Sequence, residues 1–390
     1  MTRPSWKFAE RRIAYFVSPH GYGHAARASA VMEAIQRVDP AAHFEIFTQV
    51  PRWFFQDSLS GHFGYHPLLT DIGLAQKTSL VEDLPETLQR LDGFLPFDAS
   101  QIRDIAGQVK HLQCQLVICD IAPMGIAVGR EAGIRSVLVE NFTWDWIYEG
   151  YLEYAPDLGR HITYLNELFA MADYHVQTEP VCLPGQADLT ASPVGRTIRT
   201  SAGQIRQQLG IPDQAKMVMI TMGGIPWQYD FLEQLVNHAG VYFVIPGADQ
   251  GSQVPNVPTS ANRSLAGTGP LAGTGGLVLL PHHSDFFHPD LVNAADAVIG
   301  KAGYSTVAEV YNAGVPFGYV GRPNFRESKA LTAFIKQEMI GLPIKGSQFQ
   351  NGAWLSSLSD LLALPRVHRN NSSGADQVAA FVCELLVRKG

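Results

Sequence analysis

A segment rich in glycine and histidine near the start of the chain has the composition of a ligand-binding loop. His20-Gly21-Tyr22-Gly23-His24 lies between an apolar run and a helical pattern. Glycines allow backbone amides to approach a ligand closely, and the N-terminus of the following helix favours anionic groups. Histidine titrates near neutral pH, so His24 could act as a general base on a substrate hydroxyl. The alternative is a first-turn histidine that only hydrogen-bonds the loop.

Asp120 is the carboxylate that could orient His24. It directly follows the apolar run 116–119, so both residues are expected at the carboxyl edge of a parallel sheet, where open α/β folds bind ligands. A base works best when a carboxylate holds its other ring nitrogen. We therefore expect a His24–Asp120 pair, with capping of the next helix by Asp120 as the alternative.

The same glycine loop also fits the spacing of a dinucleotide-binding fingerprint. Gly21-x-Gly23-x-x-Ala26 satisfies the pattern, but the fingerprint needs an acidic residue at the end of the next strand to hold the ribose. That strand is expected to end at Thr48-Gln49, with Glu45 inside it. The sequence argues against an NAD site, and we expect no cofactor.

A second glycine turn, Gly300 to Thr306, leads from an apolar run into a helical pattern. Backbone N–H groups and the hydroxyls of Ser305 and Thr306 would stand at a helix N-terminus, where a diphosphate binds well. Glu309 follows one turn later on the face of Ser305. An ordinary helix cap with a glutamate in a capping-box position is the competing interpretation. The pair Gly223-Gly224, after another apolar run, could face the same ligand.

An aromatic segment follows another expected strand. In Asn141-Phe142-Thr143-Trp144-Asp145-Trp146, two tryptophans flank an acid. Aromatic faces stack on sugar rings, and Asp145 could bind hydroxyl groups, so we expect these residues to line an acceptor site. Simple packing is the commoner role of tryptophan and remains open.

Histidines and aspartates between residues 282 and 290 form a candidate metal group: His282, His283, Asp285, His288 and Asp290. Their spacing fits no standard site, and the segment has the character of a loop. The sequence also contains no Asp-x-Asp motif. We therefore expect metal-independent chemistry.

Strand-like and helix-like segments alternate along the whole chain, which predicts an α/β fold of two doubly wound, Rossmann-like domains. The expected strands are 12–18, 43–48, 116–119, 136–139, 216–221, 242–245, 277–280, 297–299 and 317–320. The expected helices are 25–38, 126–132 (capped by Gly133), 204–209, 231–238, 306–313, 328–337 and 375–387.

We place the domains at 1–195 and 196–372, with a hinge near Pro193–Ser201. A terminal helical segment, 373–390, could return to the first domain. Residues 252–276 repeat Leu-Ala-Gly-Thr-Gly and are rich in Gly, Pro, Ser and Thr, so we expect a surface insertion there.

Composition excludes several classes of protein. The hydrophobic content of 46% and the net charge of −7 describe a globular chain without the basic surplus of a nucleic-acid binder. The four cysteines form no Cys-x-x-Cys pair, and no run of about 18 apolar residues could span a membrane. Residues 1–7 have no apolar signal core, so we expect a cytoplasmic location.

Five ordered sequence blocks, taken together, resemble a known family. They are His20–Arg27, Asp120–Pro123, Ala132–Val137, Asn141–Tyr148 and Gly300–Glu309. The second domain resembles GT-B glycosyltransferases, including the peptidoglycan N-acetylglucosaminyltransferase. Residues 11–345 are most similar to the non-kinase N-terminal half of plant L-arabinokinase.

The resemblance implies two facing Rossmann-like domains and a role for individual residues. His24 would be the base and Asp120 its partner, while Ser305 and Thr306 would hold phosphate and Glu309 ribose. The resemblance implies no kinase activity, because the chain ends at Gly390 without a sugar-kinase domain. The loop after Gly223-Gly224 lacks the serine that many relatives have.

We therefore expect transfer of a sugar from a nucleotide diphosphate sugar, with UDP the first nucleotide to consider, to a small-molecule or lipid-linked acceptor. Nucleotide-sugar epimerisation or hydrolysis, and non-catalytic nucleotide-sugar binding, are the alternatives. The expected donor residues are Gly223, Gly224, His282, Gly303, Tyr304, Ser305, Thr306, Glu309, Asn324, Arg326 and Glu327. The expected acceptor residues are His20, Gly21, Gly23, Asn141, Trp144 and Asp145.

Overall fold

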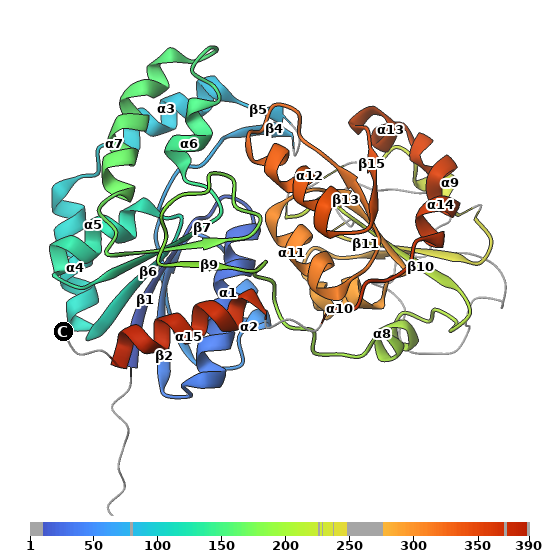
Figure 1. The fold of residues 1–390 in the computed structure, drawn as a ribbon, viewed down its shortest axis with the longest axis horizontal. Helices are drawn as coiled ribbons and strands as arrows, with labels where there is room; N and C mark the ends of the chain where they lie inside the picture. Colours follow the sequence, from blue (N-terminus) through green and yellow to red (C-terminus); the bar gives the residue numbers. More distant parts are fainter. Residues whose placement is uncertain are drawn as a thin grey trace, which may run out of the picture. The chain divides into compact units, whose positions relative to one another are not determined.

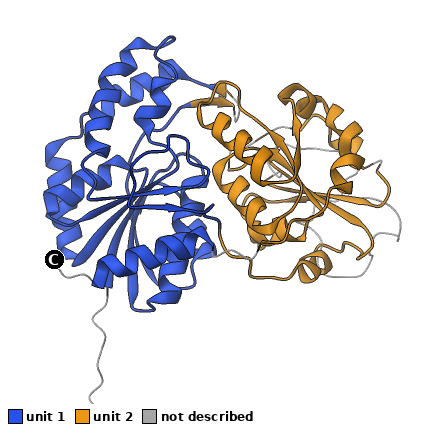
Figure 2. Ribbon diagram, in the orientation of Figure 1, with its two compact units in different colours: residues 1–75, 82–195, 372–390 blue, residues 76–81, 196–371 orange. Residues whose placement is uncertain are grey.

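The chain divides into two compact units (Figure 2). The computed structural model describes residues 11–78, 81–224, 227, 229–236, 238–247, 276–369 and 373–387. Unit 1 comprises Met1–Ala75, Glu82–Gly195 and Ser372–Gly390, and unit 2 comprises Gln76–Val81 and Arg196–Asn371. The expected insertion lies outside the described residues, apart from Gly276, which begins a strand.

Unit 1 is built on a seven-stranded sheet with the order β3-β2-β1-β6-β7-β8-β9, in which neighbouring strands run parallel. The strands are β1 (Arg11–Val17), β2 (Ala42–Thr48), β3 (Phe63–Pro67), β6 (Cys114–Asp120), β7 (Ser136–Glu140), β8 (Tyr174–Thr178) and β9 (Leu189–Ala191). The central strands are buried along nearly their whole length, as parallel strands covered on both faces must be. The α/β class expected from the sequence is confirmed.

Helices cover the sheet of unit 1. They are α1 (Gly23–Val38), α2 (Arg52–Ser58), α3 (Leu84–Phe94), α4 (Ala99–His111), α5 (Pro123–Ala132), α6 (Trp144–Glu149) and α7 (Gly159–Phe169). Gly133 ends α5 in the left-handed conformation, with φ 66°, as expected for a C-cap. Strands β4 (Gln76–Thr78) and β5 (Val81–Glu82) form a separate two-stranded sheet.

The last described helix, α15 (Gly374–Val387), belongs to unit 1 and packs against α1 (Figure 1). Val378, Ala379, Val382 and Leu385 are all buried in the same apolar cluster as residues of α1 and β1. Gly374 approaches the backbone of Ser192 so closely that a Cβ atom would collide with it. The start of α15 is thereby packed against the backbone that directly follows β9.

Unit 2 contains a six-stranded parallel sheet with the order β12-β11-β10-β13-β14-β15. The strands are β10 (Lys216–Thr221), β11 (Val241–Pro246), β12 (Gly276–Leu280), β13 (Ala297–Lys301), β14 (Phe317–Val320) and β15 (Gly341–Ile344). Alternate residues of β10 enter different cores: Met217 and Met219 join one apolar cluster, and Val218 and Ile220 join the other. Both faces of this sheet are therefore covered.

The helices of unit 2 are α8 (Ala202–Gln208), α9 (Leu232–Leu235), α10 (His288–Ala294), α11 (Tyr304–Ala313), α12 (Glu327–Glu338), α13 (Gly346–Asn351) and α14 (Leu358–Ala363). Within the helix expected at 231–238, the described residues form the short helix α9 at Leu232–Leu235. No helix in the described part of the chain is long and apolar enough to cross a membrane.

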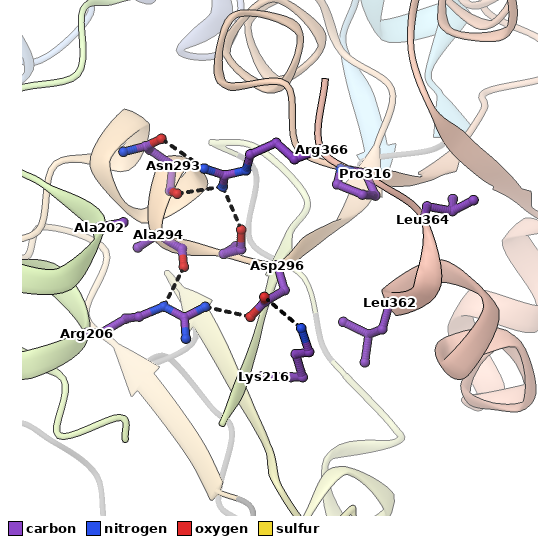
Figure 3. A pocket seen from close by; sticks show the side chains of 11 residues that line it. Ala202, Arg206, Lys216, Asn293, Ala294, Asp296, Pro316, Leu362, Leu364 and Arg366 are labelled. Carbon is purple, nitrogen blue, oxygen red and sulfur yellow. Dashed lines mark hydrogen bonds and ion pairs between the residues drawn. The ribbon is translucent and has the colours of Figure 1, made fainter. Parts of the chain in front are cut away.

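A polar pocket of about 340 Å³ lies at the amino-terminal edge of the unit 2 sheet (Figure 3). Arg206 donates hydrogen bonds to the carbonyl oxygens of Ala294 and Ala215, each at 2.9 Å, and pairs with Asp296. Arg366 donates to the carbonyl oxygens of Asn293 and Ala295 at 2.7 and 2.9 Å. Both arginines thus bind carbonyl groups at the C-terminal end of α10, which is a structural role. Parallel α/β sheets bind ligands at their carboxyl edge, and this pocket lies at the opposite edge.

Candidate functional site

His24 and Asp120 form a buried pair in unit 1. Asp120 ends β6 and lies opposite Val17, the last residue of β1, while His24 is in the first turn of α1. The Nδ1 atom of His24 lies 3.0 Å from Oδ1 of Asp120. An Nδ1–H group donating to this carboxylate leaves a lone pair on Nε2, which is the arrangement of a general base.

Arg27 completes the pair. Its Nε and Nη2 atoms donate to the two oxygens of Asp120 at 2.9 and 2.7 Å, and its Nη1 atom donates to Oδ1 of Asn141 at 2.7 Å. Burial acts to raise the pKa of Asp120, but the charge and hydrogen bonds of Arg27, with those of His24, hold the pKa below its ordinary value. The carboxylate is therefore kept ionised and its charge is balanced by Arg27.

The sequence analysis gave Arg27 no role, although a signal was present. Arg27 is the one charged residue within the stretch Ala25-Ala26-Arg27-Ala28-Ser29-Ala30, and its side chain is 1% exposed. A guanidinium group in an apolar helix face requires a carboxylate partner. That requirement points to a buried acid such as Asp120.

The backbone after Asp120 is strained. Ile121 has φ 42°, a left-handed conformation that β-branched residues rarely adopt. The residue is fully buried and bridges Val17 across the sheet edge. Strain of this kind persists where the surrounding structure fixes an unusual geometry, and it clusters at functional sites.

Two aromatic residues pack against the histidines. Trp144 meets the rings of His20 and His24 at centroid distances of 5.1 and 6.2 Å, and Phe142 meets His24 at 6.0 Å. Trp144 is 1% exposed and Asp145, which accepts from Asn166 at 3.1 Å, is 6% exposed. Trp144 and Asp145 are thus buried parts of the fold beside the site. Their contact with an acceptor stays a prediction.

The expected glycines of the first loop differ in their surroundings. Gly21 has φ 70°, and a Cβ atom there would meet nothing within 4 Å. Gly23 is the first residue of α1, whose N-cap, Tyr22, makes no side-chain capping bond. This loop therefore combines an open backbone with the N-terminus of a 16-residue helix.

A loop that the sequence analysis did not identify lies along the end of β1. Ser18 donates to Oδ1 of Asp71 at 3.0 Å, and Thr70 donates to the carbonyl of Val17 at 2.9 Å. Burial raises the pKa of Asp71 to about 8, despite the hydrogen bond from Ser18. Asp71 therefore carries a proton at neutral pH. No periodic pattern surrounds it, so the sequence holds no signal of its position.

Gly300 and Gly303 shape the turn at the end of β13 in unit 2. A Cβ atom on Gly300 would collide with the carbonyl oxygen of Thr221 in β10, so only glycine permits this approach of the two strands. Gly303 is the N-cap of α11 and provides no side-chain capping bond. Within the described residues, the hydroxyls of Ser305 and Thr306 form no hydrogen bond. The N-terminus of α11 is therefore available to an anion.

Lys301 lies between the two glycine loops, and the sequence analysis gave it no role. Its Nζ atom would be 3.8 Å from a Cβ atom on Gly223, and its Cε atom would be 3.7 Å from one on Gly303. Burial, together with the positive charge of Arg322, lowers the pKa of Lys301 to about 8 against the opposing effect of Glu327. Two cations thus gather at the ends of the adjacent strands β13 and β14.

Glu309 is held by two side chains. Its Oε1 atom accepts from Nε of Arg196 at 2.9 Å, and its Oε2 atom accepts from Nδ1 of His288 at 2.7 Å. Burial acts to raise the pKa of Glu309, but the charges and hydrogen bonds of Arg196 and His288 keep it below the ordinary value. The glutamate is therefore an ionised, buried group rather than a helix cap.

The remaining donor candidates differ in their exposure. His282 and Asn324 are exposed, Arg326 is partly buried just before α12, and Glu327 is 6% exposed at the first position of that helix. Among the residues that the structure describes, no three metal-binding side chains meet. His288 pairs with Glu309 and Asp290 accepts from the Arg199 amide at 2.7 Å.

Several solved structures to which this chain is similar are glycosyltransferases. A spinosyn forosaminyltransferase, SpnP, matches with a TM-score of 0.58 and 14% identity over 97% of this chain and 95% of that one. A UDP-glucosyltransferase from Polygonum tinctorium matches with a TM-score of 0.59 and 13% identity over 97% and 99%. MurG of Acinetobacter baumannii gives 0.51 and 15% over 97% and 100%. The chain has the GT-B fold.

A comparison of sequences adds one curated relative. L-arabinokinase of Arabidopsis thaliana is 25% identical over 381 residues, which are 96% of this chain and 34% of that protein. The chain thus spans about a third of the relative's length. No family model matches the sequence. The candidate residues of unit 1 lie at the carboxyl edge of the unit 1 sheet, and those of unit 2 lie at the carboxyl edge of the unit 2 sheet. Rossmann-like domains bind ligands at this edge.

Proposed function

We propose that this protein transfers a sugar from a nucleotide diphosphate sugar to a hydroxyl group of an acceptor. The observation that carries the proposal is the buried His24–Asp120–Arg27 arrangement at the carboxyl edge of the unit 1 sheet. The GT-B fold supports a transferase of this class. Fold by itself does not determine chemistry, so the proposal depends on these side chains.

His24 would act on the acceptor. Its Nε2 atom would take the proton of the acceptor hydroxyl as the oxygen forms a bond to the anomeric carbon. The bond from that carbon to the diphosphate oxygen breaks, and the nucleoside diphosphate leaves with the electron pair. Asp120 stabilises the imidazolium that results, because its carboxylate faces Nδ1 at 3.0 Å.

The donor diphosphate would bind in unit 2. The N-terminus of α11 and the hydroxyls of Ser305 and Thr306 provide donors, while Lys301 and Arg322 provide positive charge. These cations support the proposal that the negative charge of the departing diphosphate is balanced without a metal ion. UDP is the first nucleotide to test. We propose a small-molecule or lipid-linked acceptor and a cytoplasmic location.

A thermal-shift screen with UDP, GDP, dTDP and their sugars tests the donor site. A ligand at about 100 times its Kd stabilises the folded protein by about 2.7 kcal/mol, so a true donor raises the melting temperature measurably. If no nucleotide shifts the melting temperature and Ser305→Ala changes no nucleotide affinity, the proposed donor site is wrong.

Product analysis separates transfer from the alternatives. Sugar released from the donor without any acceptor, or an epimer of the donor sugar, would identify a hydrolase or an epimerase. Donor binding without any turnover, unchanged in His24→Ala, would identify a non-catalytic binding protein. Loss of transfer in His24→Ala with donor binding intact supports the proposed function.

A further inference from the structure

Glu309 is poorly placed for the ribose contact that the family resemblance implies. Its two carboxylate oxygens are bonded to Arg196 and His288 at 2.9 and 2.7 Å. The Glu309 side chain is 2% exposed and the Arg196 side chain 9%. A ribose hydroxyl would have to displace a buried, charged partner to reach this carboxylate, which is costly in a desolvated site.

His288 is the exposed member of this group. Its side chain is 26% exposed, and its Nε2 atom lies 3.5 Å from Oγ1 of Thr221 at the end of β10. The same hydroxyl oxygen accepts the backbone N–H of Gly223 at 3.3 Å. His288 therefore contacts the residue whose hydroxyl group holds the Gly223 amide, and Lys301 lies beside Gly223.

The two units hold a histidine in the same way. In each, Nδ1 faces a carboxylate, and an arginine pairs with that carboxylate: Arg27 with Asp120 and Arg196 with Glu309. Such a pair fixes the orientation of the imidazole ring and directs Nε2 away from the carboxylate. In unit 2, Nε2 faces Oγ1 of Thr221, two residues before Gly223.

We propose that His288 contacts the phosphate groups of the bound nucleoside diphosphate through Nε2, and that Glu309 and Arg196 are positioning residues for it. The inference rests on the proposed donor site. It assigns Glu309 an indirect role on phosphate in place of direct ribose binding. The phosphate would lie among His288, the Gly223 loop and Lys301, where cationic and N–H donors converge.

Two substitutions of His288 separate its two ring nitrogens. In His288→Asn the side-chain amide nitrogen occupies the place of Nδ1, so the contact with Glu309 is kept and the donor to phosphate is lost. In His288→Gln the amide nitrogen reaches the place of Nε2, so a donor to phosphate is retained. Glu309→Gln removes the carboxylate that orients the ring. His283→Asn, a change in an exposed histidine of the same loop, is the control.

Calorimetric titration with UDP, uridine and inorganic diphosphate tests the inference. We expect His288→Asn and Glu309→Gln to weaken UDP about ten- to hundredfold, in line with the loss of a hydrogen bond to a charged group. We expect uridine affinity to be unchanged, His288→Gln to recover part of the loss, and the double variant to be no weaker than the worse single one. Melting temperatures without ligand check that each variant is folded.

Opposite results would overturn the inference. If Glu309→Gln weakens uridine as much as UDP while His288→Asn affects neither, Glu309 binds ribose directly and His288 has no part in binding. If the wild type binds diphosphate but no nucleotide, and His288→Asn abolishes this binding, the phosphate contact stands while the proposed function fails. If the wild type binds none of the three probes, both are wrong.

Discussion

The Nδ1 atom of His24 lies 3.0 Å from the Oδ1 atom of Asp120, at the carboxyl edge of the unit 1 sheet. A general base in this position contributes about 10²- to 10⁴-fold to the rate. We predict that His24→Ala lowers sugar transfer by this factor and leaves nucleotide affinity within twofold. Measuring kcat/KM and donor Kd in the same preparation checks the prediction. His111→Ala, at the exposed end of α4, should retain wild-type activity.

Asp120 also stabilises the fold through Arg27. Removing one member of a buried ion pair leaves the other charge uncompensated, so we predict that Asp120→Asn lowers the free energy of unfolding by about 3–5 kcal/mol. The pKa of Asp120 is lower in the folded state, so its contribution is present above the ordinary pKa of an aspartate and is lost as pH falls. Urea unfolding of both proteins between pH 3 and 7 measures this. Asp92→Asn, which alters an exposed carboxylate, serves as the comparison, and equal losses in the two variants would refute the prediction.

Asp71 should have the opposite pH dependence. Because its pKa is raised to about 8 in the folded state, the folded protein holds a proton that the unfolded chain releases near pH 4. Stability conferred by the protonated group is therefore lost as pH rises, by up to about 1.4 kcal/mol for each pH unit between these limits. Asp71→Asn mimics the neutral acid, so we predict that it is more stable than the wild type above pH 8. The free energy of unfolding of both proteins is measured from pH 5 to 9. A constant difference between them over this range would mean that Asp71 is ionised throughout, against the prediction.

Lys301 should make nucleotide binding sensitive to alkaline pH. Its pKa is lowered to about 8, so the ammonium group loses its proton above that pH in the free protein. We predict that Lys301→Gln weakens nucleoside diphosphate binding by about tenfold or more, which corresponds to about 1.4 kcal/mol. Wild-type affinity should fall as pH rises above 8, and that dependence should be absent from the variant. Lys329→Gln, in an exposed position of α12, should behave as the wild type in both measurements.

The order of apolar runs predicted four of the seven strands of the unit 1 sheet, five of the six strands of the unit 2 sheet, and the edge at which His24 and Asp120 meet. Strand ends could be located because buried parallel strands are continuous apolar segments bounded by glycine or polar residues. The strand β15 was missed since Pro343 lies inside it and breaks the pattern expected of a strand. Strands β3, β8 and β9 were also not predicted, nor were helices α2, α3, α4, α6, α7, α10, α13 and α14.

Pairings between distant residues could not be derived in the same way. His288 and Glu309 were identified separately, the first in a metal group and the second as a ribose ligand, because spacing along a chain does not reveal which side chains meet. Their contact depends on where α10 begins relative to α11, and that is set by tertiary packing. Asp71 lies in a loop whose position is fixed by hydrogen bonds to Val17 and Ser18, and such bonds leave no pattern in the sequence.

The helix α15 supplies part of the core of unit 1, although it follows unit 2 in the sequence. Val378, Ala379 and Val382 pack with residues of β1 and α1, which are made several hundred residues earlier in synthesis. Domains fold as units while the chain emerges from the ribosome. Unit 2, which ends at Asn371, can therefore complete its core before unit 1 can. The unit that is translated first is the one that finishes folding last.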